Sequence, residues 1–256
     1  MKIGIIGVGH MGSAIIEGLK KNPKNEIIAQ NPVNPRVSKL VEKFGFTLFN
    51  DINEFQKQNP EIVILTTPAE ITLRVANQLR NLSKDTIIIS AAAGIKSAEF
   101  RQFLPHLDIV RIIPNIPVSV NAGTIGFSCE DDLDENTKTK IITFLKQLGD
   151  VIPVKENELS IVGTIGGCGP AFVDIFLDAL GDAAVLNGLS RDTANQLAAS
   201  MVEGSAKLAY KTKLAPALLR DKVCSPGGTT IQGVQALEKN GFRYAVMDAV
   251  NQANKN

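Results

Sequence analysis

The chain has 256 residues, with 27 Lys and Arg against 26 Asp and Glu, which gives a formal charge of +1 at pH 7. At about 150 residues per domain it holds roughly 1.7 domains, enough to bury a core without disulfides or a metal. A charge this balanced, with 5% aromatic residues and no Trp, argues against nucleic acid or an anionic membrane as a partner and leaves a globular protein with a small-molecule ligand.

Short runs rich in Ile and Val alternate with helical patterns through the first part of the chain. The runs predict strands at Ile3–Ile6, Glu26–Gln30, Ile62–Thr66, Thr86–Ser90, Ile109–Ile113 and Val151–Val154. Apolar spacing predicts helices at Arg36–Phe44, Glu70–Leu79 and Asp134–Leu148. Apolar runs with little alternation are typical of strands covered on both faces, so we expect an α/β domain with a parallel sheet.

The strand signal stops after about residue 155. Helical patterns continue at Ala171–Leu186, Arg191–Tyr210, Pro216–Val223, Ile231–Asn240 and Tyr244–Ala253. We therefore predict an α/β domain over residues 1–154 and an all-helical domain over residues 155–256. A helical domain of this size buries limited area alone, so dimerisation through it is favoured over a self-contained fold.

A glycine-rich turn follows the first predicted strand. Residues 7–12, GVGHMG, fit the pattern GxGxxG between a strand and a helix, which is typical of Rossmann dinucleotide-binding domains. We expect Gly7 to allow the tight turn, Gly9 to let a pyrophosphate approach the backbone, and Gly12 to let the helix pack on the strand. Free N–H groups of the first helical turn would then face the phosphates.

The end of the second predicted strand bears on the choice of cofactor. An NAD site usually has a carboxylate there for the ribose 2′-OH, but this chain has Asn31 followed by Pro32. Asn31 would accept a 2′-phosphate, with Arg36 as a candidate charge partner. The sequence therefore favours NADPH, with NADH as the alternative, and Arg36 fits an exposed cation at a helix start equally well.

Two more glycine-rich segments lie in the second half. Residues 225–231, SPGGTTI, place backbone N–H groups and hydroxyls before a helix, which suits a small carboxylate. An ordinary turn with a Thr N-cap fits the same residues. Residues 163–171, GTIGGCGPA, invite close backbone approach to a ligand and also fit a flexible hinge between domains.

Cysteine and histidine usage predicts no metal site. The three cysteines, Cys129, Cys168 and Cys224, are far apart, and the chain has two histidines. The first residues carry one positive charge and a short apolar run that breaks into glycines, which predicts a strand and not a signal peptide. No apolar run approaches the roughly 18 residues of a membrane span, so we expect a cytoplasmic protein with no membrane association.

Several of these segments occur in the same order in the pyrroline-5-carboxylate reductase family, which the chain resembles over essentially its whole length. The most specific is SPGGTTI at residues 225–231, followed by Gly233, Leu237-Glu238 and the GFR of residues 241–243. RIIPNIP at residues 111–117 is similar to the family's Arg-x-Met-Pro-Asn-Thr-Pro segment. Matches also occur in SAAAGI at residues 90–95 and GCGPA at residues 167–171.

The resemblance implies a reductase that transfers hydride from NAD(P)H to 1-pyrroline-5-carboxylate, a cyclic imine, in the last step of proline biosynthesis. It implies a Rossmann domain followed by a helical domain that pairs with a second subunit, as a homodimer or a larger assembly of dimers. The cofactor-binding residues expected from it are Gly7, Gly9, Met11, Gly12, Thr67, Pro68, Ala92, Ala93, Gly94 and Asn115, to which the residues themselves add Asn31 and Arg36. The expected substrate-binding residues are Ser225, Gly228, Thr229, Thr230, Gly169 and Pro170.

Thr230 is the candidate catalytic residue. A cyclic imine arrives partly as the electrophilic iminium, so no strong general acid is required, and the site motifs contain no His, Glu or Lys. Catalysis would rest on positioning of the reactants and on the cofactor's hydride chemistry. The Thr230 hydroxyl would donate a hydrogen bond to the ring nitrogen.

The chain departs from the family pattern at a few positions. Gly166, Cys168 and Phe172 stand where the family usually has two hydroxyls and a phenol, Ile116 replaces a Thr, and Thr67 replaces a common Lys. Two alternatives follow: a diverged paralogue that binds NAD(P) without efficient activity, or a related reductase of another imine or a β-hydroxyacid. A β-hydroxyacid enzyme would be expected to carry a catalytic Lys in its helical domain.

Overall fold

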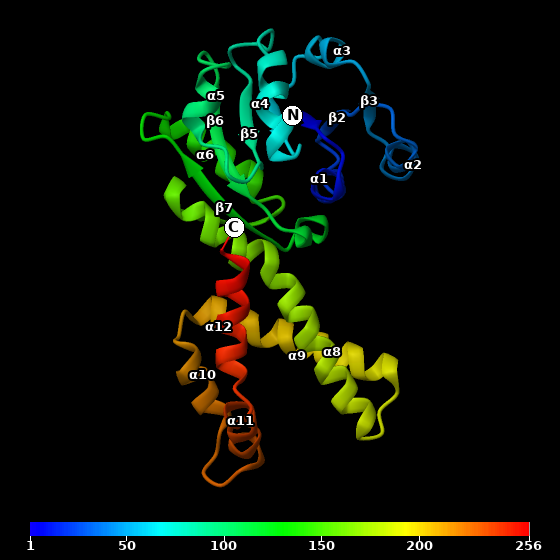
Figure 1. Ribbon diagram of the computed structural model, residues 1–256. Helices are drawn as coiled ribbons and strands as arrows, with labels where there is room; N and C mark the ends of the chain where they lie inside the picture. The colour runs from blue at the N-terminus through cyan, green and yellow to red at the C-terminus, as the bar shows by residue number, and fades with distance from the viewer. Residues whose placement is uncertain (256) are drawn as a thin grey trace. The chain divides into compact units, whose positions relative to one another are not determined.

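The computed structural model describes residues 1–255 and divides into two compact units, Met1–Gly167 and a second that begins at Cys168 (Figure 1). The division lies beyond residue 154 because the segment that follows the last strand packs on the first unit. Leu159 is 2% exposed, and a Cβ on Gly126 of the sheet would lie 2.5 Å from Val162. The domain limits given above stay a prediction.

The first unit is built on an eight-stranded sheet in the order β3-β2-β1-β4-β5-β6-β7-β8. Neighbouring strands are parallel except β6 and β7. The order reverses between β1 and β4, the point at which ligands bind beyond the carboxyl ends of the strands in doubly wound folds. The strands are β1 (Lys2–Ile6), β2 (Glu26–Gln30), β3 (Thr47–Phe49), β4 (Ile62–Leu65), β5 (Ile87–Ser90), β6 (Asp108–Ile113), β7 (Gly123–Cys129) and β8 (Gly149–Pro153).

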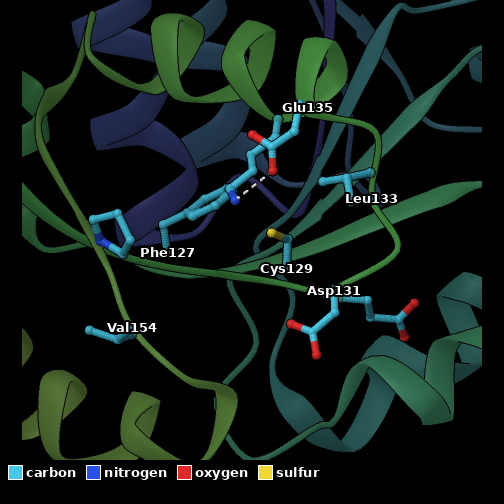
Figure 2. Close-up of a pocket in the computed structure, with 9 residues that line it drawn as sticks. Phe127, Cys129, Asp131, Leu133, Glu135 and Val154 are labelled. Carbon is cyan, nitrogen blue, oxygen red and sulfur yellow. Dashed lines mark hydrogen bonds and ion pairs between the residues drawn. The ribbon is translucent and has the colours of Figure 1, made fainter.

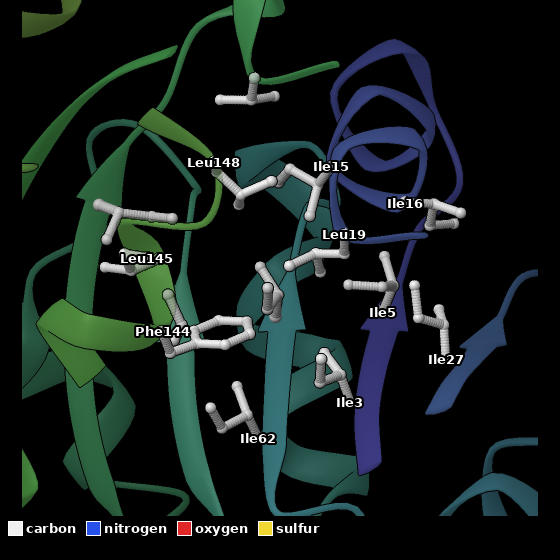
Figure 3. Packing of buried hydrophobic residues seen from close by; sticks show 14 of the residues in the cluster. Ile3, Ile5, Ile15, Ile16, Leu19, Ile27, Ile62, Phe144, Leu145 and Leu148 are labelled. Carbon is white, nitrogen blue, oxygen red and sulfur yellow. The ribbon is translucent and has the colours of Figure 1, made fainter. Parts of the chain in front are cut away.

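Both faces of this sheet are covered by helices, as the apolar strands require. Ile3 and Ile5 pack with residues of α1 and α6 on one face (Figure 3). Val63 and Leu65 pack on the other face, with residues of α3, α4 and α5. Alternate residues of a strand therefore enter two separate cores. The helices of this unit are α1 (His10–Lys20), α2 (Pro35–Phe44), α3 (Ile52–Gln56), α4 (Ala69–Gln78), α5 (Ser97–Arg101), α6 (Glu135–Leu145) and α7 (Leu159–Val162), with short 3₁₀ turns η1 (Ile116–Val120) and η2 (Glu156–Glu158).

The predicted α/β class and Rossmann arrangement are confirmed, but the sequence analysis missed two strands. β7 lies inside the sheet, antiparallel to β6, and reads GTIGFSC. Its glycines and small polar residues give no Ile- or Val-rich run, since Gly126 is required where Val162 packs closely on it. β3 is a three-residue strand at the sheet edge, and the five-residue helices α3 and α5 were also missed.

The second unit is all-helical, as predicted. Its helices are α8 (Gly169–Leu186), α9 (Arg191–Thr212), α10 (Pro216–Val223), α11 (Thr229–Lys239) and α12 (Phe242–Ala253). The glycine-rich segment before α8 is not an open loop, because Gly163–Cys168 forms a π-helix, η3. Within residues 1–255, no strand follows Pro153.

Large apolar side chains of the second unit are exposed in the single chain. Ile175 is 72% exposed, Leu186 87% and Tyr244 74%. Only a few small residues of this unit are buried, among them Gly181, Ala194 and Ala198. Helices α8 to α12 therefore have apolar faces that the chain itself does not cover.

One stretch is an exception to the expectation that no segment has the character of a membrane span. The helical stretch Glu156–Leu186 passes by length and composition, with a mean hydropathy of 1.5 over its most apolar window, of which 11% is buried. Polar and small residues interrupt its sequence, so it contains no uninterrupted apolar run as long as a membrane span. The part of this stretch that lies in α8 belongs to the uncovered apolar face of the second unit.

Candidate functional site

The glycine-rich turn lies between β1 and α1, at the point where the strand order reverses. Gly7 has φ +92°, a backbone conformation that favours glycine, and a Cβ on Gly12 would overlap the carbonyl oxygen of Gly7. A Cβ on Gly9 would meet nothing within 4 Å, and Gly9 is exposed. Gly9 is also the N-cap of α1, with no side-chain hydrogen bond. The turn thus presents open backbone at the start of a helix, an arrangement that suits phosphate.

Side chains of neighbouring loops hold this turn in place. The Val8 N–H donates to Asn31 Oδ1 at 2.9 Å, and the Arg36 guanidinium donates to the Val8 carbonyl. The Thr66 hydroxyl donates to the Gly7 carbonyl oxygen at 2.6 Å. The turn is therefore fixed from β2, α2 and β4.

Asn31 and Arg36, the two residues that the sequence analysis linked to a 2′-phosphate, differ in availability. The Asn31 amide is engaged on both sides, since its Nδ2 donates to the Pro32 carbonyl at 2.7 Å. Arg36 is exposed at the start of α2, after the N-cap residue Asn34, and its guanidinium donates one hydrogen bond within the protein, to the Val8 carbonyl. A guanidinium has five N–H donors, so Arg36 can still bind an anion beside the turn.

The remaining predicted cofactor residues of the first unit lie at the same edge of the sheet. Thr67 and Pro68 follow β4, and Ala92, Ala93 and Gly94 follow β5; β4 lies beside β1 and β5 beside β4, and the three strands are parallel. Pro68, Ala93 and Gly94 are exposed, while Ala92 is 4% exposed. Met11 is half-buried in the first turn of α1.

Asn115, two residues after the end of β6, is 6% exposed, and both its amide nitrogen and its amide oxygen make hydrogen bonds within the protein. Its Nδ2 donates to the Gly166 carbonyl at 3.0 Å, and its Oδ1 accepts the Thr124 N–H at 2.8 Å. The side chain therefore joins the π-helix η3 to β7. Its amide is used for this structural contact, and the prediction that it lies near a nicotinamide is untested.

The substrate residues predicted in the second unit lie in the connection between α10 and α11. Gly228, whose N–H donates to the Ser225 carbonyl at 3.1 Å, is the N-cap of α11 and has no side-chain cap. Thr229 and Thr230 occupy the first helical turn and are exposed. The alternative prediction of a Thr N-cap is wrong, because the N-cap is Gly228. The first N–H groups of α11 therefore lie beside two exposed threonine residues.

Gly169 and Pro170 belong to a different element, the first turn of α8. Proline is favoured there because its missing N–H has no helical partner to lose. Both residues are half-buried, and a Cβ on Gly169 would meet nothing within 4 Å. No described residue thus requires glycine at position 169 by close contact.

A separate pocket of about 380 Å³ opens where β7 and β8 end (Figure 2). Because β7 is antiparallel to β6, this lies at the opposite end of the strands from the glycine-rich turn. Phe127, Leu133, Pro153 and Val154 give it an apolar side, while Glu135 forms an ion pair with Lys138 at 3.1 Å. Burial raises the pKa of the Cys129 thiol in its wall, which disfavours the reactive thiolate. The pocket is separate from the glycine-rich turn. Residues 1–255 contain no cluster of side chains that could hold a metal ion.

Two hydroxyl residues that support the turn and the loop after β4 are not indicated by any of the sequence motifs: Thr66, at the end of a predicted strand, and Thr72. Thr72 bonds to the Thr67 hydroxyl at 2.8 Å and so fixes the loop after β4. Threonine directly after a buried apolar strand was the available signal, since such a hydroxyl can satisfy carbonyls at the strand end.

Comparisons with known proteins cover both units. Residues 156–256 match the family model for pyrroline-5-carboxylate reductase dimerisation, and residues 2–94 match the model for NADP oxidoreductase, coenzyme F420-dependent. The pyrroline-5-carboxylate reductase of Escherichia coli is 34% identical over 97% of this chain and 94% of the relative. That of Synechocystis is 34% identical over 99% of this chain and 96% of the relative.

A solved structure agrees with these matches. The Plasmodium falciparum pyrroline carboxylate reductase, solved with NADP bound, superposes with a TM-score of 0.85 at 27% identity. The match covers 100% of this chain and 96% of that one. Fold, length and sequence therefore lead to the same group of proteins.

Proposed function

We propose that NADPH is the hydride donor of this chain and that residues 225–230 hold its substrate. Both proposals start from its identity: the chain belongs to the pyrroline-5-carboxylate reductase family and reduces 1-pyrroline-5-carboxylate to proline with a nicotinamide cofactor. The observation that carries the activity is the match to named reductases over almost the full length of both chains. The chain is therefore an oxidoreductase, and the paralogue and β-hydroxyacid alternatives are set aside.

The glycine-rich turn fits a dinucleotide. Gly9 is exposed with open space where a side chain would stand, and the N-cap of α1 has no side-chain hydrogen bond. The pyrophosphate would bind the N–H groups at this helix start. When bound, the reduced nicotinamide supplies the hydride for the imine carbon.

The proposal for NADPH rests on Arg36. β2 ends without a carboxylate, and the Arg36 guanidinium is held beside the turn by the Val8 carbonyl while its remaining donors are exposed. A doubly charged 2′-phosphate gains a charge-assisted hydrogen bond at this position, whereas a 2′-hydroxyl gains much less. Asn31 acts indirectly, because its side chain is used by Val8.

The test is a comparison of kcat/KM with NADPH and with NADH. Arg36→Ala is expected to lower kcat/KM for NADPH by about tenfold or more, the equivalent of about 1.4 kcal/mol, and to lower the value for NADH by a clearly smaller factor, through loss of the hydrogen bond to the Val8 carbonyl alone. Lys39→Ala is the control, because it removes another exposed cation of α2. Equal losses with both cofactors would contradict the proposed role of Arg36.

We propose that the start of α11 binds the substrate. Its first N–H groups would bind the carboxylate. The Thr230 hydroxyl would donate to the ring nitrogen of the neutral imine and hold it in place, and this nitrogen would take its proton from solvent as hydride adds to the imine carbon. Thr230→Ala is expected to lower kcat by roughly tenfold or more, and Thr230→Ser, which keeps the hydroxyl, to recover most of it. Near-normal kcat and KM in Thr230→Ala would remove this role.

The second unit is a dimerisation region by its family match, and we propose that a second copy of the chain covers its apolar helices. The exposed apolar residues of α8, which form the second part of the stretch Glu156–Leu186, would then be buried between subunits, so that the protein is a soluble, cytoplasmic homodimer or a larger assembly of dimers. Sedimentation of the purified chain in detergent-free buffer tests this. A monomer, or a protein that requires detergent, would contradict it.

A further inference from the structure

Arg111 is a buried charge with no role in the function described so far. It lies inside the sheet on β6, and its side chain is 6% exposed. Its Nε has no hydrogen-bond partner. A buried ion pair that is incompletely hydrogen-bonded contributes little net stability, so a contribution to stability alone does not account for an arginine here.

The partner of Arg111 is Glu156, which begins the short turn η2 directly after the last strand. Glu156 Oε1 lies 3.2 Å from the guanidinium of Arg111 and also accepts the N–H of Ser97 at 2.8 Å and its hydroxyl at 2.9 Å. Desolvation raises the pKa of Glu156, but these three donors outweigh it, and the pKa lies below its ordinary value. Glu156 is thus an ionised anchor.

The other end of the same segment is also held from β6. Asn115 follows that strand by two residues and donates to the Gly166 carbonyl in the π-helix η3. Between the two anchors, Leu159 is 2% exposed and Val162 packs against Gly126 of β7. Residues 156–166, which we call the connecting segment, are therefore fixed to the sheet at both ends and in the middle.

The connecting segment is the part of the chain that leads into the second unit. Gly166 is held at the carboxyl edge of the sheet, the edge with the glycine-rich turn, and Gly169 and Pro170 follow it in the sequence. Reacting atoms must approach to roughly 3–3.5 Å for transfer, and small displacements lower the rate strongly. A shift of the point at which the chain leaves the sheet is therefore expected to change the rate of hydride transfer.

We propose that Arg111 and Asn115 are positioning residues of the reductase reaction: from β6 and from the residues just after it, they hold the two ends of the connecting segment and so fix where the substrate-binding half of the chain begins. This inference rests on the proposed function. Arg111 acts through Glu156, and Asn115 acts through the carbonyl of Gly166. Loosening the segment lowers the rate of hydride transfer while the glycine-rich turn, held by other residues, keeps its affinity for the cofactor.

The test uses Glu156→Gln in the full-length protein. The amide oxygen can still accept from Ser97, but the charge that pairs with Arg111 is gone. We expect kcat to fall about tenfold with the Kd for NADPH within about twofold of the original, and Glu156→Asp to recover part of the loss. The matched control is Glu158→Gln in the same turn, whose carboxylate accepts only the Lys155 N–H among the described contacts and whose kcat should not change.

A second, milder variant covers the case in which Glu156→Gln does not fold. Ser97→Ala removes one donor to Glu156 and should lower kcat by a smaller factor, again without a change in the Kd for NADPH. Unchanged kcat in the folded variants, or a parallel loss of NADPH affinity, would overturn the positioning role alone. An original chain that binds NADPH but does not turn over pyrroline-5-carboxylate would contradict the proposed function and this inference together.

Discussion

The two units of this chain bury their apolar residues in opposite ways. In the first unit, two closed cores flank the sheet, and side chains such as Ile5, Ile64 and Phe144 are 0–2% exposed. In the second unit, Ile175 and Leu186 are more than two thirds exposed. A difference this large within one chain means that the first unit obtains its core from its own sequence, whereas the second requires surface from another copy.

The difference also divides the chemistry. The glycine-rich turn, which we propose binds the cofactor, is assembled and braced within the first unit, but the proposed substrate loop lies between helices with little buried core. Stability of the substrate half should therefore depend on protein concentration, since association of copies contributes to it. Stability of the cofactor half should not.

The largest expected effect is in the closed core. Phe144→Ala in α6 removes a ring that is 2% exposed and should lower the free energy of unfolding by about 3–5 kcal/mol, by the same amount at every protein concentration. Denaturant unfolding at two concentrations measures this. Thr143→Ala, at an exposed position of the same helix, should change it little. A small loss for Phe144→Ala would mean that the first unit is not the independent core described above.

The next effect is on assembly. Ile175→Asp on α8 would bury an unpaired charge in the dimer, so we expect at least roughly 100-fold weaker dimerisation and a parallel loss of turnover, with cofactor binding retained. Sedimentation and a cofactor titration follow the two properties. Val120→Asp, at an exposed position of the first unit, serves as the control. A stable dimer of Ile175→Asp would show that this face is not the interface.

A smaller effect separates two glycines of the turn. Gly9→Ala should leave the melting temperature of the cofactor-free protein unchanged, because the added Cβ meets nothing, but should weaken NADPH binding by about tenfold. Gly12→Ala should lower both, because its Cβ overlaps the Gly7 carbonyl. Nucleotide fluorescence and thermal melts measure the pair. Unimpaired NADPH binding by Gly9→Ala would place the phosphates elsewhere.

The smallest effect is on the pH dependence of stability. The pKa of Glu156 lies below its ordinary value in the folded chain, so its contribution is present above the unfolded pKa of about 4.3 and is lost as pH falls through the folded pKa. The stability difference between the original chain and Glu156→Gln should therefore be full near neutral pH and shrink in acid. Unfolding curves over that range measure it, and a difference that grew in acid would have the wrong sign.

The parts of the fold that follow local rules could be predicted from the sequence. The turn at Gly7 and Gly12, the Ile-rich strands and the helices of the second unit each carry their signal in neighbouring residues. β7 could not be predicted in this way, because Gly126 is required by the close packing of Val162 and Gly123 by that of Val118, and not by strand propensity.

The candidate site shows the same limit. Arg111 and Glu156 are remote in sequence, and nothing near either residue indicates that they meet. The π-helix could not be predicted either, because four glycines within residues 163–169 are typical of an open loop. The contacts made by Asn115 and by the apolar side chains of this segment hold it in helical form, and these depend on the completed sheet.

The bracing of the glycine-rich turn has a consequence for the rate and strength of nucleotide capture. With Val8 held by Asn31 and Arg36, and Gly7 held by Thr66, the backbone that we propose to face the phosphates has lost its freedom during folding. A rigid receptor surrenders less entropy when its ligand arrives, so more of each phosphate contact appears as affinity. The nucleotide should then bind to a preorganised site, and the association rate should be limited by diffusion and orientation and not by rearrangement of the loop.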